Sequence, residues 1–239
     1  MKINLQSSKA RGFTLLELLI VISIIAILSI ALIFMLNPAE TLKKSRDAQR
    51  ISDLNTLKTA IGVMLTASST PSLDNFGTLC LTTATGATNS GKGIAYSAYK
   101  ASITFASTAG GSDTSIAFSG TGVPPTTQAV AGKVDGTGWV PINFKALTGG
   151  SPISSLPVDP INTIAATAAT STDLVYRYGC QNGTPTATTK PSYVFEIDAQ
   201  LESSAYTSED NKRANDGGDN ASFYEVGNSL NVLPTAEGF

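Results

Sequence analysis

The sequence predicts an α+β protein in which a long N-terminal helix, membrane-spanning in its first half, packs on a small antiparallel β-sheet. The helix is indicated by a predominantly apolar run from Phe13 to Leu36, whose only charged residue is Glu17. The sheet is indicated by residues 174–180 and 193–198, in which aromatic and aliphatic residues recur at every second position. Together they predict one exported domain behind a single anchoring helix.

The apolar run is long enough to cross a bilayer. Its 24 residues extend about 36 Å as a helix, against a hydrocarbon core of about 30 Å. A secretory signal peptide has a shorter apolar region followed by a small-residue cleavage site, whereas this run ends in Met35-Leu36-Asn37-Pro38. Residues 1–12 carry three cations and no acid, which favours a cytoplasmic start, although four cations after the run reduce the asymmetry.

Glu17 is the unusual feature of this run. A carboxylate at the centre of a bilayer costs about 2.5 to 3.5 kcal/mol, so such a residue is by default a functional candidate that needs a cationic partner. The alternative is that Glu17, close to the start of the helix, lies at the depth of the lipid headgroups.

The segment Gly12-Phe13-Thr14-Leu15-Leu16-Glu17-Leu18 resembles the N-terminal signature of the prepilin family, which comprises type IV pilins and the pseudopilins of type II secretion systems. In that family a membrane aspartic peptidase cuts between the glycine and the phenylalanine and methylates the new amine. The resemblance therefore implies cleavage between Gly12 and Phe13, N-methylation of Phe13, and pairing of Glu17 with the Phe13 amine of a neighbouring subunit. It is dense over residues 10–65 and thin afterwards.

The implied pairing is physically reasonable. An isolated Glu17 in a packed apolar filament core would be uncompensated, whereas a neighbour's amine offsets the desolvation and disfavours every wrong axial register. Methylation leaves that amine positively charged.

Beyond the apolar run the helix continues in amphipathic form. Apolar residues recur at three- and four-residue steps, which is typical of a half-buried helix: Ile51, Leu54, Ile61 and Leu65. Pro38 removes one backbone hydrogen bond and disfavours the helical region for Asn37, so we expect one bent helix to about Ala67, with two helices as the alternative. The predicted organisation is a leader at 1–12, the N-terminal helix at 13–67, with its transmembrane part at 13–36, and an exported β-rich domain at 68–239.

The exported domain is expected to contain few confidently placed strands. Residues 68–132 are rich in Ser, Thr, Ala and Gly, which indicates short strands, loops or linker. The alternating segments near 174–180 and 193–198 predict an antiparallel pair of half-buried strands. Trp139 to Phe144 could supply a third strand, which Pro141 would place at an edge. Glu196 and Asp198 share one strand face, which we interpret as a solvent-exposed face rather than a catalytic pair.

Cys80 and Cys180 are the two cysteines of the chain. In an exported protein an even pair predicts a disulfide, worth about 4.7 kcal/mol for a loop near 100 residues in the chain-entropy model. The alternative is two buried thiols.

Oxygen-bearing side chains are concentrated near the C-terminus. Some major pseudopilins bind calcium in an acidic C-terminal loop, so the resemblance makes Asp210, Asp216 and Asp219 candidate calcium ligands. Their spacing departs from the twelve-residue calcium loop, and a solvated turn explains the same composition.

Composition argues against catalysis. The chain has no histidine, which excludes imidazole-based hydrolases and histidine zinc sites, and its two cysteines are too few for a four-cysteine site. No phosphate-binding Gly-x-x-x-x-Gly-Lys loop is present. The net charge is −2, and −5 in side chains once three leader cations are removed, so we expect no nucleic-acid partner.

The function expected from the sequence is that of a non-enzymatic structural subunit of a type IV pilus-like filament. Its expected partners are copies of itself, other pilin-like subunits, a prepilin peptidase and the membrane. Its expected location is the bacterial cytoplasmic membrane, and then a cell-surface or periplasmic filament. The alternatives are a type II secretion pseudopilin, a single-pass membrane-anchored binding protein that never polymerises, and a secreted enzyme behind an unusual signal.

Overall fold

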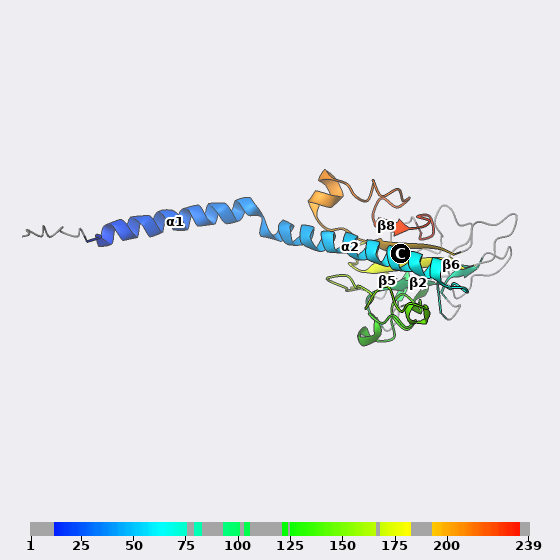
Figure 1. Cartoon of the computed structure of the whole chain (residues 1–239). Coiled ribbons are helices and arrows are strands. Elements are labelled where there is room, and N and C mark those ends of the chain that lie inside the picture. The colour runs from blue at the N-terminus through cyan, green and yellow to red at the C-terminus, as the bar shows by residue number, and fades with distance from the viewer. Residues whose placement is uncertain are drawn as a thin grey trace, which may run out of the picture. The chain divides into compact units, whose positions relative to one another are not determined.

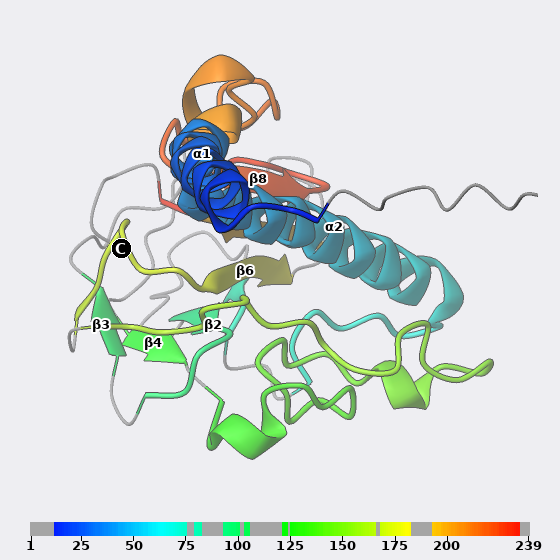
Figure 2. The same ribbon diagram turned by 90° about the vertical axis from the view of Figure 1, so that its left-hand side faces the viewer.

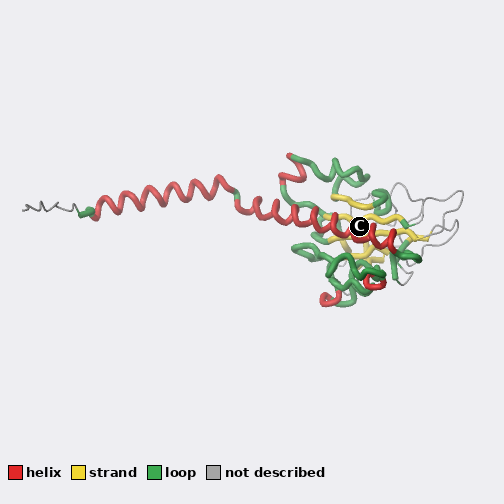
Figure 3. Tube along the Cα trace, viewed as in Figure 1, coloured by secondary structure: helices red, strands yellow, loops and turns green. Residues whose placement is uncertain are grey.

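The computed structural model describes residues 12–75, 79–82, 93–100, 103–105, 121–123, 125–165, 168–182 and 193–234. It comprises two compact units, Met1–Leu42 and Lys43–Phe239 (Figures 1 and 3). The first unit contains helix α1 (Leu15–Leu36) and the start of helix α2 (Pro38–Ala67). Most of α2 and the whole sheet belong to the second unit, which is the β-rich domain.

The helical region is interrupted once, between α1 and α2. Asn37 has a φ of 38°, in the left-handed region that commonly ends helices, and Pro38 then occupies the first helical position of α2. A missing N–H costs nothing at that position, because the first donors of a helix have no partner inside it. Two helices, the alternative to the single bent helix that we expected, are therefore observed, and the second ends at Ala67 as predicted.

α2 packs against the sheet through one face. Its buried residues are spaced at about one helical turn: Asp47, Arg50, Leu54, Leu57, Ala60, Ile61 and Met64. The apolar members belong to a core cluster with residues of the sheet, among them Tyr176, Tyr178 and Ile197. The predicted amphipathic pattern is therefore confirmed, and it continues toward the start of the helix with charged residues in buried positions. The course of α2 beside the sheet can be followed in Figure 2.

The sheet is built around four antiparallel strands, β2 (Gly93–Tyr96), β6 (Tyr176–Asn182), β7 (Val194–Ala199) and β8 (Tyr224–Gly227), which pair in that order. Four short strands extend it: β1 (Leu81–Thr82), β3 (Ile103–Phe105), β4 (Thr121–Val123) and β5 (Ala168–Ala169). Of these, β1 pairs with β6, β4 with β2, and β5 with β3, all in parallel. The described residues also form 3₁₀-helices at Gln128–Val130 and Phe144–Ala146 and a π-helical turn at Ala205–Glu209. The α+β prediction, with an N-terminal helix and an antiparallel sheet, is confirmed.

The predicted pair of strands is present, but the expectation that each is half-buried is wrong. β6 and β7 pair with Tyr178 opposite Ile197 and Cys180 opposite Phe195. One face of the pair lies under α2, and the other is covered by a second apolar cluster that includes Tyr96, Phe223 and Val232. Both faces are therefore buried, because segments distant in sequence cover the face that carries the polar residues.

The expected third strand at Trp139 to Phe144 is also wrong. The N–H of Trp139 donates to the carbonyl of Ala131, whereas that of Phe144 donates to Val134, so the segment forms no continuous ladder. Trp139 is 1% exposed, and its indole Nε1–H donates to the carbonyl of Pro157 over 2.7 Å. The segment is apolar because it fills the core as a loop.

Cys80 and Cys180 are joined by a disulfide, with their Cα atoms 4.6 Å apart. Both side chains are buried in the core cluster beneath α2. The neighbouring backbone is held as well, since Asp74 Oδ2 accepts hydrogen bonds from the N–H groups of Leu79 and Cys80. The bridge therefore attaches the segment before β1 to the central strand β6.

A buried ion cluster attaches the first half of α2 to the rest of the domain. The Arg50 guanidinium donates to both carboxylate oxygens of Asp159, at 2.6 and 3.0 Å, and through Nη1 to Asp47 and Glu202. Arg46 adds a two-pronged pair with Glu202, with both distances 2.7 Å. Arg50, Asp47 and Asp159 are almost completely buried.

We expect Arg50→Met to lower the free energy of unfolding by about 3 to 5 kcal/mol, because it leaves buried carboxylates without their counter-charge. The measurement is denaturant unfolding of the full chain in detergent micelles, followed by the emission of Trp139, the chain's single tryptophan. Lys58→Met, on the exposed side of the same helix, is the matched control and should change stability little. A loss below about 1 kcal/mol, the value typical of a surface ion pair, would contradict the assignment.

Candidate assembly site at the start of α1

The predicted cleavage position lies directly before α1. Gly12 and Phe13 are outside regular secondary structure, and Phe13 is 80% exposed. Among the described residues, no atom lies within 4 Å of the place that a Cβ on Gly12 would occupy. The fold of this chain therefore does not itself require glycine at position 12. Residues 1–11 of the predicted leader lie outside the described residues.

Glu17 is held by a capping box at the first turn of α1. The backbone N–H and the hydroxyl of Thr14 both donate to Glu17 Oε2 at 2.9 Å, and the Glu17 N–H donates back to Thr14 Oγ1 at 3.2 Å. This arrangement satisfies donors that the start of a helix otherwise leaves unpaired. It also turns the carboxylate toward the N-terminus of the helix. Its partner Thr14 directly follows Phe13, the residue that carries the predicted new amine.

The capping box uses only one oxygen of the Glu17 carboxylate. Both Thr14 donors go to Oε2, and Oε1 makes no hydrogen bond within the described part of the chain. A second cationic donor can therefore approach Oε1 without breaking the cap.

The remainder of α1 presents apolar side chains on every side. None of its residues is buried, and Phe34 and Met35 are more than 80% exposed. The hydroxyls of Ser23 and Ser29 donate to carbonyls of the preceding turn, so they leave no unsatisfied donor on the surface of the helix. Such a helix requires an apolar environment, either lipid or other helices.

By length and composition, the helical region Leu15–Ala67 contains one segment able to cross a membrane. A family model described as the prokaryotic N-terminal methylation motif matches residues 7–33. The chain carries a prepilin-type N-terminus. This is the signature of type IV pilins and pseudopilins, and the match spans the predicted cleavage position, Glu17 and most of α1. No curated protein and no solved structure matches the chain.

The methylation motif and the length and apolar surface of α1 together make α1 the candidate membrane helix of the chain. The signature includes the three residues singled out in the sequence, Gly12, Phe13 and Glu17, which lie within one stretch of six residues. Thr14 was missed as the partner of Glu17, although the Thr-x-x-Glu spacing of a capping box is visible in the sequence.

A second group of polar residues lies buried on the face of the sheet opposite α2. Asp198 and Glu225 are directly paired across β7 and β8, and Arg177 pairs with Asp198 across β6 and β7. Arg177 Nη1 lies 3.4 Å from Asp198 Oδ1, and its guanidinium stacks 4.1 Å from the ring centre of Phe223. Glu196 Oε2 accepts hydrogen bonds from the N–H groups of Val232 and Leu233.

This burial corrects the expectation that Glu196 and Asp198 occupy an exposed strand face, since both are 0% exposed. Burial raises the pKa of Asp198 to about 6, although the positive charge and the hydrogen bond of Arg177 lower it in part. Burial also raises the pKa of Glu225 to about 7. The pKa of Glu196 lies well above its ordinary value, first because the side chain is buried and second because Glu225 is its neighbour. These acids therefore favour the protonated form more strongly in the folded chain than in the unfolded one.

The calcium candidates do not form a metal-binding group in the described residues. Asp210 is an exposed partner of Lys212 at 2.7 Å, and the two oxygens of Asp216 accept from the N–H groups of Gly218 and Glu225. No group of three or more His, Cys, Asp or Glu residues is placed to hold a metal in the part of the chain that the structure describes, Asp219 included.

The raised pKa values predict that stability falls as the pH rises from about 4.5 to about 7. In that window the folded state holds protons that the unfolded state releases, so folding is favoured at the acidic end. Below it the trend reverses, because hydrogen bonds from Arg46 and Arg50 lower the pKa of Glu202 to about 2 and that pairing is lost as the acid is protonated.

We expect the free energy of unfolding of the full chain in micelles to be about 1 to 3 kcal/mol higher at pH 5 than at pH 8. Glu225→Gln should flatten this dependence, because the substitution removes one of the titrating groups. Glu209→Gln, at an exposed position, should leave it unchanged. A stability that rises from pH 5 to pH 8 would refute the assignment.

Proposed function

We propose that the chain is a structural subunit of a type IV pilus-like filament. It is cut between Gly12 and Phe13 by a prepilin peptidase, methylated on Phe13, and assembled through α1. The observation that carries the proposal is the methylation motif at residues 7–33, which coincides with an apolar helix that buries none of its side chains within the chain. Copies of itself and other pilin-like subunits supply the missing contacts.

Glu17 is the assembly residue in this proposal. Its Oε2 is held by Thr14, and its Oε1 accepts the methylated amine of a neighbouring subunit's Phe13. The cap fixes the direction of the carboxylate before the partner arrives, which lowers the entropy lost on pairing. Only the correct axial register brings an amine to this oxygen, so the pair also selects the stagger between subunits.

The proposed location follows from the order of the leader, α1 and the β-rich domain along the chain. The basic leader remains on the cytoplasmic side, α1 spans the cytoplasmic membrane, and the domain of α2 and the sheet is exported. The subunit then leaves the membrane for a surface or periplasmic filament. We propose no catalytic role, because the carboxylates of the sheet are buried structural groups and the chain has no histidine to act as a base.

Mass spectrometry of the N-terminal peptide from native membranes or sheared surface fibres tests processing. We expect a chain that begins at methylated Phe13. An uncut Met1 would support a membrane anchor that never polymerises, and a start after Leu36 would mean that α1 is removed as a signal. Either result would overturn the filament proposal.

Glu17→Ala tests assembly separately from processing. We expect filament yield to fall at least tenfold, while membrane insertion continues, because the apolar run is retained and the register-setting pair is lost together with the Glu17 half of the capping box. Ser23→Ala is the matched control, since its hydroxyl bonds only to Ile20 in the same helix. The measurement is the subunit content of sheared fibres and of membranes; wild-type fibre yield from Glu17→Ala would refute the role of this carboxylate.

A pseudopilin of a type II secretion system carries the same N-terminal signature. Deletion of the gene that encodes this chain distinguishes a pilus subunit from a secretion pseudopilin. Loss of long surface fibres with normal secretion supports the pilus assignment, whereas loss of secretion without loss of such fibres would assign the chain to a secretion pseudopilus.

A further inference from the structure

Two buried carboxyl groups lie against each other on the face of the sheet opposite α2. Glu196 of β7 is 0% exposed, and Glu225 of β8 is 3% exposed. The strands pair with Glu196 opposite Gly227 and Asp198 opposite Glu225. The two glutamates are therefore diagonal neighbours on one face of the sheet. Their carboxyl groups are close enough to hydrogen-bond to each other.

A hydrogen bond between these two groups requires a proton. Ionised carboxylates only accept hydrogen bonds, so at least one of the pair must be protonated. Glu196 Oε2 accepts from the N–H groups of Val232 and Leu233, at 2.7 and 2.8 Å. Glu196 Oε1 is buried and receives no donor within the described part of the chain. Oε1 is therefore the oxygen left to share a proton with Glu225.

The charges around the pair are mainly negative. Burial is the main reason that the pKa of both Glu196 and Glu225 is raised, and the charge of Asp198 raises both further. Asp216 adds to the effect on the pKa of Glu225. The cation Arg177 lies 3.4 Å from Asp198 and compensates that acid. Loss of the shared proton would place two like charges side by side in a buried site, which is costly.

The other side of this pair is supplied by residues 220–234, which include β8 and are called the C-terminal segment below. Glu225 Oε2 accepts from the N–H of Asn220 at 3.2 Å, and Asn220 Nδ2 donates to the carbonyl of Pro234 at 3.2 Å. The two N–H groups that donate to Glu196 Oε2 also belong to this segment. The segment therefore surrounds both carboxyl groups and is joined to β7 through them.

We propose that the proton shared by Glu196 and Glu225 is a pH-sensitive switch that controls the C-terminal segment. While the proton is present, it joins β8 to β7, and the segment covers the sheet. When the proton is lost, the two carboxylates repel each other, and the segment separates from β7 so that water reaches both charges. The remaining domain stays folded, because the core cluster under α2 and the disulfide contain neither glutamate.

The direction of the switch follows from the raised pKa values. The closed segment holds a proton that the open segment releases. Opening therefore becomes more favourable as the pH rises from about 4.5, the ordinary pKa of a glutamate, through the raised values. The closed form is favoured in mildly acidic solution, and the open form gains population above neutral pH. The switch is independent of filament assembly, since α1 contributes no residue to it.

Hydrogen–deuterium exchange of the full chain in detergent micelles, read by mass spectrometry, tests the proposal. Exchange is measured at about pH 5.5 and about pH 8 with EDTA present, and the rates are corrected for the intrinsic pH dependence of amide exchange. We expect the protection of the C-terminal segment to fall about tenfold or more at the higher pH. We also expect the segment to be at least about tenfold less protected there than a reference region, because its opening is local.

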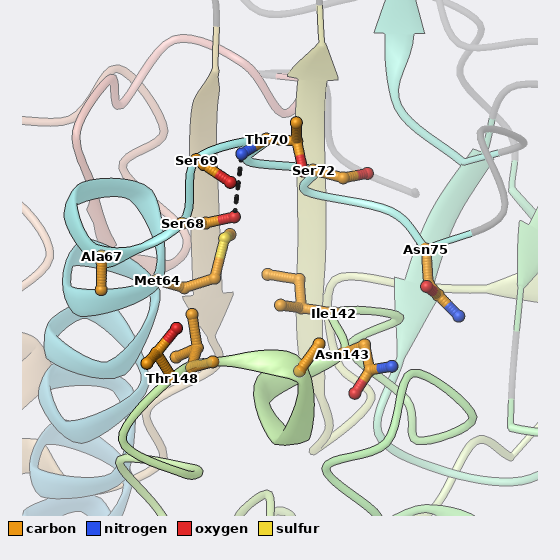
Figure 4. Close-up of a pocket in the computed structure, with 12 residues that line it drawn as sticks. Met64, Ala67, Ser68, Ser69, Thr70, Ser72, Asn75, Ile142, Asn143 and Thr148 are labelled. Carbon is orange, nitrogen blue, oxygen red and sulfur yellow. Dashed lines mark hydrogen bonds between the residues drawn. The ribbon is translucent and has the colours of Figure 1, made fainter.

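The reference region is the end of α2 with the loop packed beside it. Met64 and Ile142 are 3% and 1% exposed, and both lie at the hollow drawn in Figure 4. Neither residue contacts the glutamate pair through any hydrogen bond of the described chain, so exchange in this region reports unfolding of the domain as a whole.

Two variants identify the groups that share the proton. Glu196→Gln keeps the shape of the side chain and gives Glu225 a permanent donor, so the pH-dependent fall in protection should shrink to less than about fivefold. Glu225→Gln carries the same expectation and decides if the first variant fails to fold. Glu209→Gln, at an exposed position, is the matched control and should behave as the wild type.

Equal protection of the segment at the two pH values would overturn the proposal. So would equal protection of the segment and the reference region at pH 8, or a glutamine variant that keeps the wild-type dependence. Failure of both glutamine variants to fold, judged by Trp139 emission, would contradict it as well, since a neutral donor should suit the closed segment. Filament yield plays no part in these measurements, so failure of the switch and failure of the proposed function are distinguishable.

Discussion

The attachment of α2 to the sheet domain depends on Arg50. Its guanidinium has three carboxylate partners, Asp47 on its own helix, Asp159 in a loop and Glu202 just after β7. Those partners are themselves anchored: Asp47 Oδ2 accepts from the backbone and hydroxyl of Ser203, and Asp159 Oδ1 accepts from the N–H of Ile161. Each carboxylate therefore has a cationic partner and further hydrogen bonds, which is the condition under which buried ions are tolerated.

This cluster lies on the first turns of α2 within the domain, while the apolar contacts of Leu54, Leu57 and Ile61 follow further along. The polar end determines the register, because an ion pair tolerates little displacement, and the apolar end supplies most of the buried area. Along the chain, α1 is connected to the domain through the start of α2, so any force applied to α1 reaches the domain at this polar end. The helix is held there by directional bonds rather than by packing alone.

The sequence was sufficient for features that depend on local periodicity. The run from Phe13 to Leu36, the end of the helical region at Ala67 and the pairing of β6 with β7 all follow from spacing along the chain. It was insufficient where partners are far apart. Arg50 looks like one half of a surface pair with Asp47, yet Asp159 lies 109 residues away and Glu202 lies 152 residues away.

The errors in the domain have the same origin. Alternation along β7 correctly separates its two faces, but it cannot show that Phe223 and Val232 cover the face that carries Glu196 and Asp198. The apolar character of Trp139 to Phe144 reflects burial, which a core-filling loop and a strand share. At the candidate assembly site, Gly12, Phe13 and Glu17 could be identified from the sequence. That Glu17 Oε2 accepts from Thr14 while Oε1 does not could be seen only from side-chain positions.

The contact between Glu196 and the backbone of Val232 and Leu233 has a consequence for the order of folding. These two residues supply both the donors for a buried carboxylate and part of the apolar cover of the sheet. They lie 36 and 37 residues after Glu196, so β6 and β7 can pair before that face is covered. Until Val232 and Leu233 reach the sheet, β7 exposes an acidic face to solvent.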